Sequence, residues 1–233
     1  MQIVLVRHAQ PHWYAGEGDT HITNPPLTEL GRRQAELVGE QLAEEHWDRI
    51  LVSPLLRCRE TAAPLLKRLG QEEVVADWLE EIRDPDWQGY TREQVIKLYA
   101  AESQVAIEER WKGLPGGEDI HAFIDRIEEG LSGFLAEYGI TRHEHDVPSW
   151  TTVHGSPADK VNGPRILLVA HGGTNSVVTA NLLGAPRVPW QWSRIGYRHT
   201  TVGRFEAQAT SHVLHWMLQG LETHHLPHGL RTA

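Results

Sequence analysis

The sequence predicts an α/β fold built around a mostly parallel sheet. Apolar runs that suit strands alternate along the 233 residues with amphipathic segments that suit helices, and this alternation is typical of the fold class. The runs 3–6 and 166–170 contain only aliphatic residues. Continuous aliphatic runs indicate strands that are covered on both faces, as in a parallel sheet.

Each further element has a local signal of its own. The stretch 10–26 is polar and rich in loop-forming residues. Thr28 is predicted to cap a helix that carries Glu29 in its first turn and continues with apolar helical spacing to Leu42. Pro54 is predicted to open the next helix, where a missing N–H does no harm. We expect strands at 49–53, 74–76, 165–170, 202–207 and 213–218, and helices at 54–69, 91–101, 118–138 and 174–183.

The length of the chain suits one large domain or two small ones, with room for a substantial core. We find no internal repeat and no low-complexity tract in the sequence. We therefore expect residues 1–233 to form a single domain. The stretch 139–164 is polar, with prolines and glycines, and is expected to be a loop or an insertion.

The charge balance limits the kinds of partner. The chain has 22 Lys and Arg residues against 31 Asp and Glu residues, a formal net charge of −9. This balance disfavours a nucleic acid or a membrane surface as partner, and an anionic substrate then needs a local cluster of cations. No apolar run is long enough to span a membrane, and Met1 stands one residue before the first strand. The single cysteine fits a reducing compartment, so we expect a cytoplasmic protein.

Two of the predicted strands run into a histidine. His8 comes shortly after the run 3–6, and His171 directly follows the run 166–170. Open α/β sheets bind ligands at the carboxyl ends of their strands. We therefore expect both histidines in one crevice. Neutral imidazole is nucleophilic near pH 7, which makes His8 the candidate nucleophile, while His171 is expected to act as an imidazolium ion.

The residues around these histidines suit a phosphoryl group, whose charged oxygens need fixed cations. Arg7 and Arg57 supply planar guanidinium groups near the same edge of the sheet. Gly172 opens a helix whose free N–H groups point at an anion. Glu81 follows the strand 74–76 and is the candidate general acid. Four other acidic residues nearby compete for that role: Asp77, Glu80, Asp84 and Asp86.

These segments resemble the ordered motifs of the histidine phosphatase superfamily, also called phosphoglycerate mutase-like. The similar segments are 6–9 (Val-Arg-His-Ala), 27–31 (Leu-Thr-Glu-Leu-Gly), 53–57 (Ser-Pro-Leu-Leu-Arg), Glu81, 87–89 (Trp-Gln-Gly), 115–118 (Pro-Gly-Gly-Glu) and 170–173 (Ala-His-Gly-Gly). The resemblance extends from residue 2 to about 183 and more weakly to the end of the chain. It implies a three-layer α/β/α sandwich.

The resemblance also implies a mechanism without metal or cofactor, in which His8 becomes a covalent phosphohistidine. By motif position, Arg7, Arg57 and His171 would form the charged pocket. The Gly172 N–H would assist them. Glu81 would protonate the leaving oxygen and then activate water.

Three positions depart from the family pattern. Ala9 stands where glycine is usual, Gln10 stands where glutamate is usual, and Tyr14 replaces the asparagine that usually follows Trp13. These changes do not affect the residues that are expected to carry the phosphoryl chemistry. They put the inference of a substrate in doubt, and the substrate is not readable from the sequence.

A phosphomonoester hydrolase that acts on a small phosphorylated metabolite is the favoured function. Phosphoglycerate mutases resemble one another in an Arg-Arg pair and a Pro-rich segment, and we see neither between Glu81 and His171. Two alternatives stay open: mutase-type phosphoryl transfer, and non-catalytic phosphate binding by the same fold. A homo-oligomer also stays open.

Other residue patterns carry weaker predictions. The pairs His143-x-His145 and His224-His225 do not have a strong zinc spacing, so we expect no metal site. Tryptophans in predicted loops can form an aromatic wall near the mouth of the site for a sugar, a base or an apolar ester. These tryptophans are Trp13, Trp87, Trp190 and Trp192.

Overall fold

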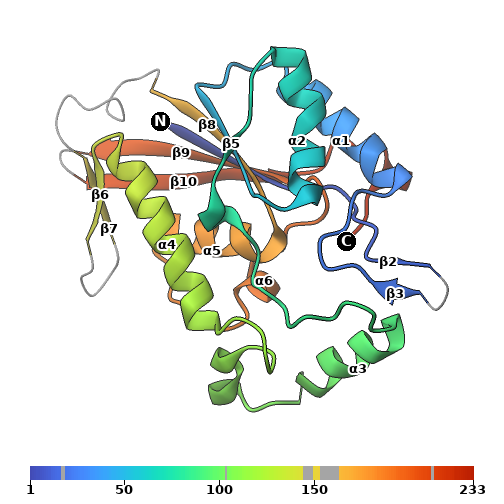
Figure 1. Cartoon of the computed structure of the whole chain (residues 1–233). Coiled ribbons are helices and arrows are strands. Elements are labelled where there is room, and N and C mark those ends of the chain that lie inside the picture. Colours follow the sequence, from blue (N-terminus) through green and yellow to red (C-terminus); the bar gives the residue numbers. More distant parts are fainter. Residues whose placement is uncertain (17–18, 103, 144–148, 153–162, 211–212) are drawn as a thin grey trace.

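A central sheet lies between two layers of helices in the computed structural model (Figure 1). The structure describes residues 1–16, 19–102, 104–143, 149–152, 163–210 and 213–233. Within these residues, helices α1 (Glu29–Leu42) and α2 (Leu56–Leu69) cover one face of the sheet. Helices α4 (Ile120–Ala136) and α5 (Gly172–Leu182) cover the other face. The predicted α/β/α sandwich is confirmed.

The described sheet has the strand order β5-β4-β8-β1-β9-β10-β7-β6. The strands are β1 (Gln2–Arg7), β4 (Arg49–Val52), β5 (Val74–Val75), β6 (Ile140–His143), β7 (Ser149–Thr152), β8 (Arg165–Ala170), β9 (Val202–Thr210) and β10 (Val213–Glu222). The strands β5, β4, β8 and β1 are parallel, while β9 and β7 run against the rest. In register, Val6 of β1 and Val52 of β4 both pair with Val169 of β8, so these three strands end at the same edge.

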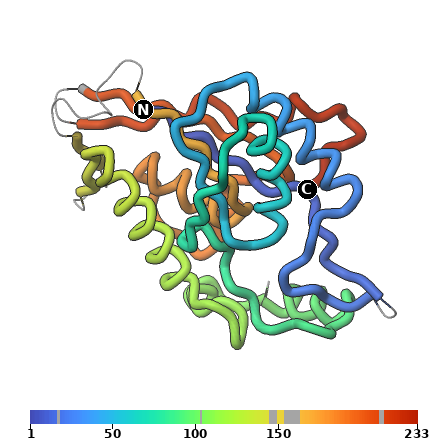
Figure 2. Tube along the Cα trace, turned by 45° about the horizontal axis from the view of Figure 1, so that its top comes forward, coloured from blue at the N-terminus to red at the C-terminus, as the bar shows by residue number. Residues whose placement is uncertain are grey.

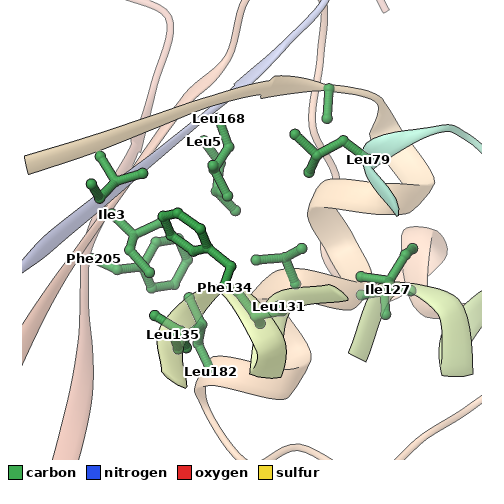
Figure 3. Packing of buried hydrophobic residues seen from close by; sticks show 14 of the residues in the cluster. Ile3, Leu5, Leu79, Ile127, Leu131, Phe134, Leu135, Leu168, Leu182 and Phe205 are labelled. Atoms are coloured by element: carbon green, nitrogen blue, oxygen red, sulfur yellow. The ribbon is translucent and has the colours of Figure 1, made fainter. Parts of the chain in front are cut away.

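Alternate side chains of the central strands enter two separate cores. Ile3 and Leu5 face the layer of α4 and α5, whereas Val4 and Val6 face α1 and α2. Figure 3 shows the first core, in which Ile3, Leu5, Leu168 and Phe205 of the sheet meet leucines and Phe134 from the helices. Each fully buried aliphatic or aromatic side chain of this kind contributes about 1.5–3 kcal/mol. Burial on both faces explains why these strands read as unbroken aliphatic runs.

The stretch 139–164 was expected to be a loop or an insertion, and in its described part this expectation is wrong. It contains β6 and β7, which pair with each other and extend the sheet beyond β10. Only Ile140 in β6, and Trp150 and Thr152 in β7, are buried, so the strands carry little apolar signal. Their pairing depends on β10, which is distant in sequence. Residues 144–148 and 153–162 of this stretch lie outside the described residues.

Shorter elements gather beside the carboxyl edge of the sheet. The polar stretch 10–26 contains a small hairpin, β2 (Tyr14–Ala15) and β3 (Thr20–His21). Helix α3 (Arg92–Glu102) lies next to this hairpin in both views (Figures 1 and 2). A β-bridge joins Thr20 to Thr91, and Arg92 forms an ion pair with Asp19 at 2.7 Å. Four further short helices lie among the described residues: Asp77–Leu79, Ile107–Lys112, α6 (Gln191–Arg194) and His228–Leu230.

Two glycines of α4 make a matched test of this packing. A Cβ at Gly130 would lie 2.2 Å from Cγ of Trp78, whereas a Cβ at Gly133 would meet nothing within 4 Å. We expect Gly130→Ala to lower the free energy of unfolding by about 1–3 kcal/mol through overpacking. Gly133→Ala should raise it by about 0.5–1 kcal/mol because alanine favours the helix. Urea denaturation of the two variants measures both effects, and changes of the same sign would contradict the close approach of Trp78.

Candidate active site

A cavity of about 660 Å³ opens at the edge where β1, β4 and β8 end. The residues that line it include Arg7, His8, Arg57, Glu81 and Gly172. Five of the six predicted site residues therefore line one cavity, although they come from distant parts of the chain. The sixth, the second histidine, lies directly behind it.

His8 follows β1 and is held in one orientation. Its backbone N–H donates to the carbonyl of Ala170 at 2.9 Å, and its Nδ1 lies 2.8 Å from the carbonyl of Ala9. The Nδ1–H must donate to that carbonyl, which leaves a lone pair on Nε2. Burial, assisted by the charge of Arg57, lowers the pKa of His8 well below its ordinary value. The ring is therefore neutral at pH 7, with the lone pair of Nε2 free to act as a base.

Arg57, which is buried, and Arg7, which is partly buried, both line the cavity without an ionic partner among the described residues. Arg57 is 4% exposed, lies 4.8 Å over the ring of Trp13, and makes no side-chain hydrogen bond to a described residue. Arg7 donates one hydrogen bond, to the carbonyl of Tyr197 at 2.6 Å, and its Nε has no partner among the described residues. Buried charges are costly unless they are paired. The arrangement therefore provides two cations for an anionic ligand.

His171 lies behind His8, with 5.2 Å between the ring centroids, and it has no exposed surface. Its Nε2 lies 2.7 Å from Oγ of Ser53 and 3.4 Å from Sγ of Cys58. Burial, followed by the charges of Arg57 and Arg7, lowers the pKa of His171 well below its ordinary value. Burial therefore favours the neutral ring of His171, and its expected action as an imidazolium ion toward a phosphoryl oxygen stays a prediction.

Glu81 sits at the N-terminus of α5. Its carboxylate accepts hydrogen bonds from the N–H groups of Gly173 at 2.9 Å and Thr174 at 3.0 Å. A Cβ at Gly173 would lie 2.5 Å from Oε1 of Glu81, so this close approach requires glycine. The Gly172 N–H has no acceptor among the described residues and stays available to a ligand. An anion at a helix N-terminus is stabilised by such donors.

A side chain of α4, that of Arg126, holds the segment that carries Glu81. Arg126 donates to the carbonyls of Glu80 at 3.0 Å and Glu81 at 3.3 Å, and it forms an ion pair with Glu118 at 2.9 Å. Of the competing acids, Glu80 pairs with Arg83 at 2.8 Å. Two of the others do not line the cavity: Asp77 and Asp86. Asp84 does line it.

A third buried histidine, beside His8, was not predicted. The ring centroid of His199 lies 5.7 Å from that of His8, and its Nδ1 lies 2.8 Å from Oγ1 of Thr232. Burial, assisted by the charge of Arg7, lowers the pKa of His199 to about 3. Because β9 is antiparallel to β1, the start of β9 meets the end of β1 and brings this residue to the site. A strand predicted without its direction does not reveal this proximity.

Comparison with known proteins agrees with this architecture. The sequence pattern of the histidine phosphatase superfamily (branch 1) matches residues 3–146. The chain belongs to this superfamily. It is 32% identical to phosphoserine phosphatase 1 of Hydrogenobacter thermophilus over 138 residues, which are 59% of this chain and 64% of that protein.

Two further similarities cover almost the whole chain. A probable phosphoglycerate mutase of Yersinia enterocolitica is 28% identical over 225 residues, 94% of this chain and 89% of that protein. The solved structure of a mycobacterial glucosyl-3-phosphoglycerate phosphatase has a TM-score of 0.68 and 26% identity, and the match covers 94% of this chain and 96% of that one. The relatives thus include named phosphatases and a named mutase.

The described residues also bear on membrane spans and metal sites. We find no helix among them that is long and apolar enough to cross a membrane. They also contain no group of three or more His, Cys, Asp or Glu side chains placed to hold a metal ion. His145, one of the paired histidines in the sequence, lies outside the described part of the chain.

The buried neutral histidines make the stability of the fold depend on pH. Burial lowers the pKa of His8 and His171 well below the ordinary value, and that of His199 to about 3. Below about pH 6.5 the unfolded chain binds protons at these positions and the folded chain does not. The free energy of unfolding therefore decreases as the pH is lowered below about 6.5, by up to about 1.4 kcal/mol per pH unit for each histidine. Asp84, whose pKa burial raises to about 6, acts in the opposite direction.

We expect urea denaturation in phosphate-free buffer to give a lower free energy of unfolding at about pH 5.5 than at about pH 7.5. His199→Gln should reduce this difference. His46→Gln, which removes a histidine whose side chain is 76% exposed, is the control. Stability that stays constant between the two pH values would contradict the neutral state of the buried rings.

Proposed function

We propose that the protein is a metal-independent phosphomonoester hydrolase that acts on a small phosphorylated metabolite. One observation carries the proposal: Arg7 and Arg57 have buried N–H donors without acceptors among the described residues, beside the neutral ring of His8. Two fixed cations with spare donors, next to a nucleophile, suit in-line displacement at phosphorus. The named phosphatases among the relatives support the same reaction.

In the first step, Nε2 of His8 attacks the phosphorus atom and the bond to the leaving oxygen breaks. Arg7 and Arg57 bind the equatorial oxygens, and the Gly172 N–H donates to one of them. Glu81, in its protonated form, gives its proton to the leaving oxygen. The products of this step are an alcohol and phosphohistidine on His8.

In the second step, water attacks the phosphorus atom and the P–N bond breaks. The carboxylate of Glu81 takes a proton from this water, so that phosphate leaves and His8 returns to its neutral form. His171 lies next to the reacting ring. A dianionic phosphoryl group nearby favours the charged form of an imidazole, so we infer that His171 gains its positive charge only when substrate is bound.

His8→Ala should lower the rate of hydrolysis of para-nitrophenyl phosphate by about a thousandfold or more, because the nucleophile is lost. His12→Ala changes an exposed histidine on the same segment and should leave the rate unchanged. Steady-state assays of both variants, before and after treatment with a chelator, test the proposal. Equal rates for wild type and His8→Ala would refute it, as would a loss with chelator that zinc restores.

The same assays separate hydrolysis from mutase-type transfer. A trapped phosphoenzyme should lose its phosphoryl group to water within a turnover. Persistence of this phosphoenzyme until a phosphorylated acceptor is added would instead support phosphoglycerate mutase-type transfer.

Glu81→Gln should affect substrates according to their leaving groups. For an alkyl phosphate, whose leaving oxygen needs a proton, we expect kcat to fall by about 10²–10⁴-fold. For para-nitrophenyl phosphate, whose leaving group departs as an anion, the loss should be much smaller. Glu80→Gln, at the neighbouring carboxylate paired with Arg83, is the control. An equal loss for both substrates would remove Glu81 from the role of general acid.

A further inference from the structure

Beyond the arginines, one side of the cavity is walled by aromatic side chains in continuous contact. Trp13 stacks on His21 with 5.7 Å between centroids, His21 meets Trp87 at 5.6 Å, and Trp87 meets Tyr99 at 5.2 Å. We call these four residues the aromatic wall. Its first member lies under Arg57 at 4.8 Å, so the wall begins beside the phosphate-binding cations.

The aromatic wall joins three separate segments of chain. Trp13 and His21 belong to the hairpin region, Trp87 to the segment after Glu81, and Tyr99 to α3. Trp13, His21 and Tyr99 line the cavity, whereas Trp87 is 3% exposed and supports them from behind. A flat apolar surface that begins at the phosphate pocket and leads away from it is where the organic part of a phosphate ester would lie.

A carboxyl group stands at the far end of the wall. The hydroxyl of Tyr99 lies 3.3 and 3.4 Å from the two oxygens of Asp84, which also lines the cavity. Asp84 makes no ion pair with a described residue, and it accepts a hydrogen bond only from Tyr99. A carboxylate can accept about four hydrogen bonds, so this group has capacity left. Although Asp84 is exposed at the rim of the cavity, the protein atoms around its carboxyl group, assisted by the charge of Glu81, raise its pKa to about 6.

A flat apolar face with an acceptor at its end fits a ring that bears hydroxyl groups. The C–H face of such a ring stacks on aromatic side chains, and a hydroxyl donates to the carboxyl group. A second anionic group placed against Asp84 would be repelled. Two cations also line the cavity: Arg83, which pairs with Glu80 at 2.8 Å, and Arg110, which donates to the carbonyl of Val105 at 3.2 Å. Substrates with a second anion therefore belong in the test.

We propose that Asp84, held by Tyr99, selects phosphate esters whose leaving group is a hydroxylated ring, and that it accepts a hydrogen bond from a ring hydroxyl lying on the aromatic wall. This inference rests on the proposed function and names the substrate class of the same site. Asp84 acts on specificity. The displacement at phosphorus stays with the residues already described.

The test compares esters of hydroxylated rings with the ester of a ring that has no hydroxyl groups. Glucose 6-phosphate, mannose 6-phosphate and ribose 5-phosphate carry hydroxylated rings, and cyclohexylmethyl phosphate carries a ring without them. We expect wild type to prefer at least one sugar phosphate over cyclohexylmethyl phosphate by about tenfold or more in kcat/KM, since a site built for a hydrogen bond discriminates against a ligand that lacks it. Equal values for all four esters would overturn the inference. Preference for 3-phosphoglycerate or for phosphoethanolamine would also overturn it.

Variants then assign the preference to one residue. Asp84→Leu should lower kcat/KM for the preferred sugar phosphate by about tenfold, mainly through KM, and leave cyclohexylmethyl phosphate unchanged. Asp84→Asn keeps an acceptor and should retain most of the preference for the sugar phosphate. Tyr99→Phe should show a preference between those of Asp84→Leu and Asp84→Asn. Asp86→Asn changes an acid outside the cavity and is the control. An equal loss on all esters with Asp84→Leu would mean that Asp84 supports structure alone, and the inference would fail.

These outcomes stay distinct from a failure of the proposed function. If wild type hydrolyses none of the esters, or if His8→Ala hydrolyses them equally well, the proposed function itself falls. If hydrolysis depends on His8 but shows no preference for hydroxylated rings, only the inference on Asp84 falls.

Discussion

The backbone N–H of His8 donates to the carbonyl of Ala170 at 2.9 Å, and this bond closes the ladder between β1 and β8. Everything at the candidate site depends on that pairing. It places one histidine directly after β1 beside another directly after β8, and the parallel register with β4 adds Ser53 at the same edge. A slip of one residue in either strand would turn every side chain to the opposite face. The two cores, one on each face of the sheet, resist such a slip because both faces of β1 are buried.

The same edge carries an energetic cost that the rest of the fold must offset. A guanidinium group that is 4% exposed and makes no hydrogen bond to a described residue, as Arg57 does, is destabilising on its own. Stacking on Trp13 recovers part of this cost, because a cation over an indole face is attracted to it. An anionic ligand would recover more. The site therefore lowers the stability of the free protein and in return can bind an anion. Such a local loss of stability is common at functional sites.

Strong local patterns made much of this architecture predictable. The buried central strands produce unbroken aliphatic runs, and Thr28 caps α1 by accepting from the N–H of Gly31 at 2.9 Å. The elements that escaped prediction have weak local signals and strong tertiary causes. The edge strands β6 and β7 bury few side chains, and His199 comes to the site through the direction of β9. The charge of His171 depends on burial, which a sequence motif does not reveal.

The positions that depart from the family pattern, Ala9, Gln10 and Tyr14, do not line the cavity themselves. Tyr14 replaces the usual asparagine, and its ring lies 4.6 Å from the guanidinium of Arg92 and 5.6 Å from the ring of His21. It therefore supports the aromatic wall from outside and ties the hairpin to α3. Gln10 replaces the usual glutamate, and its Oε1 accepts from Oγ1 of Thr28 at 2.8 Å, which anchors the start of α1. Arg7, His8, Arg57 and His171 keep the residues of the family pattern, whereas Tyr14 departs from it in contact with the aromatic wall. Of the departures, Tyr14 is therefore the one placed to act on the choice of substrate, through the wall that it supports.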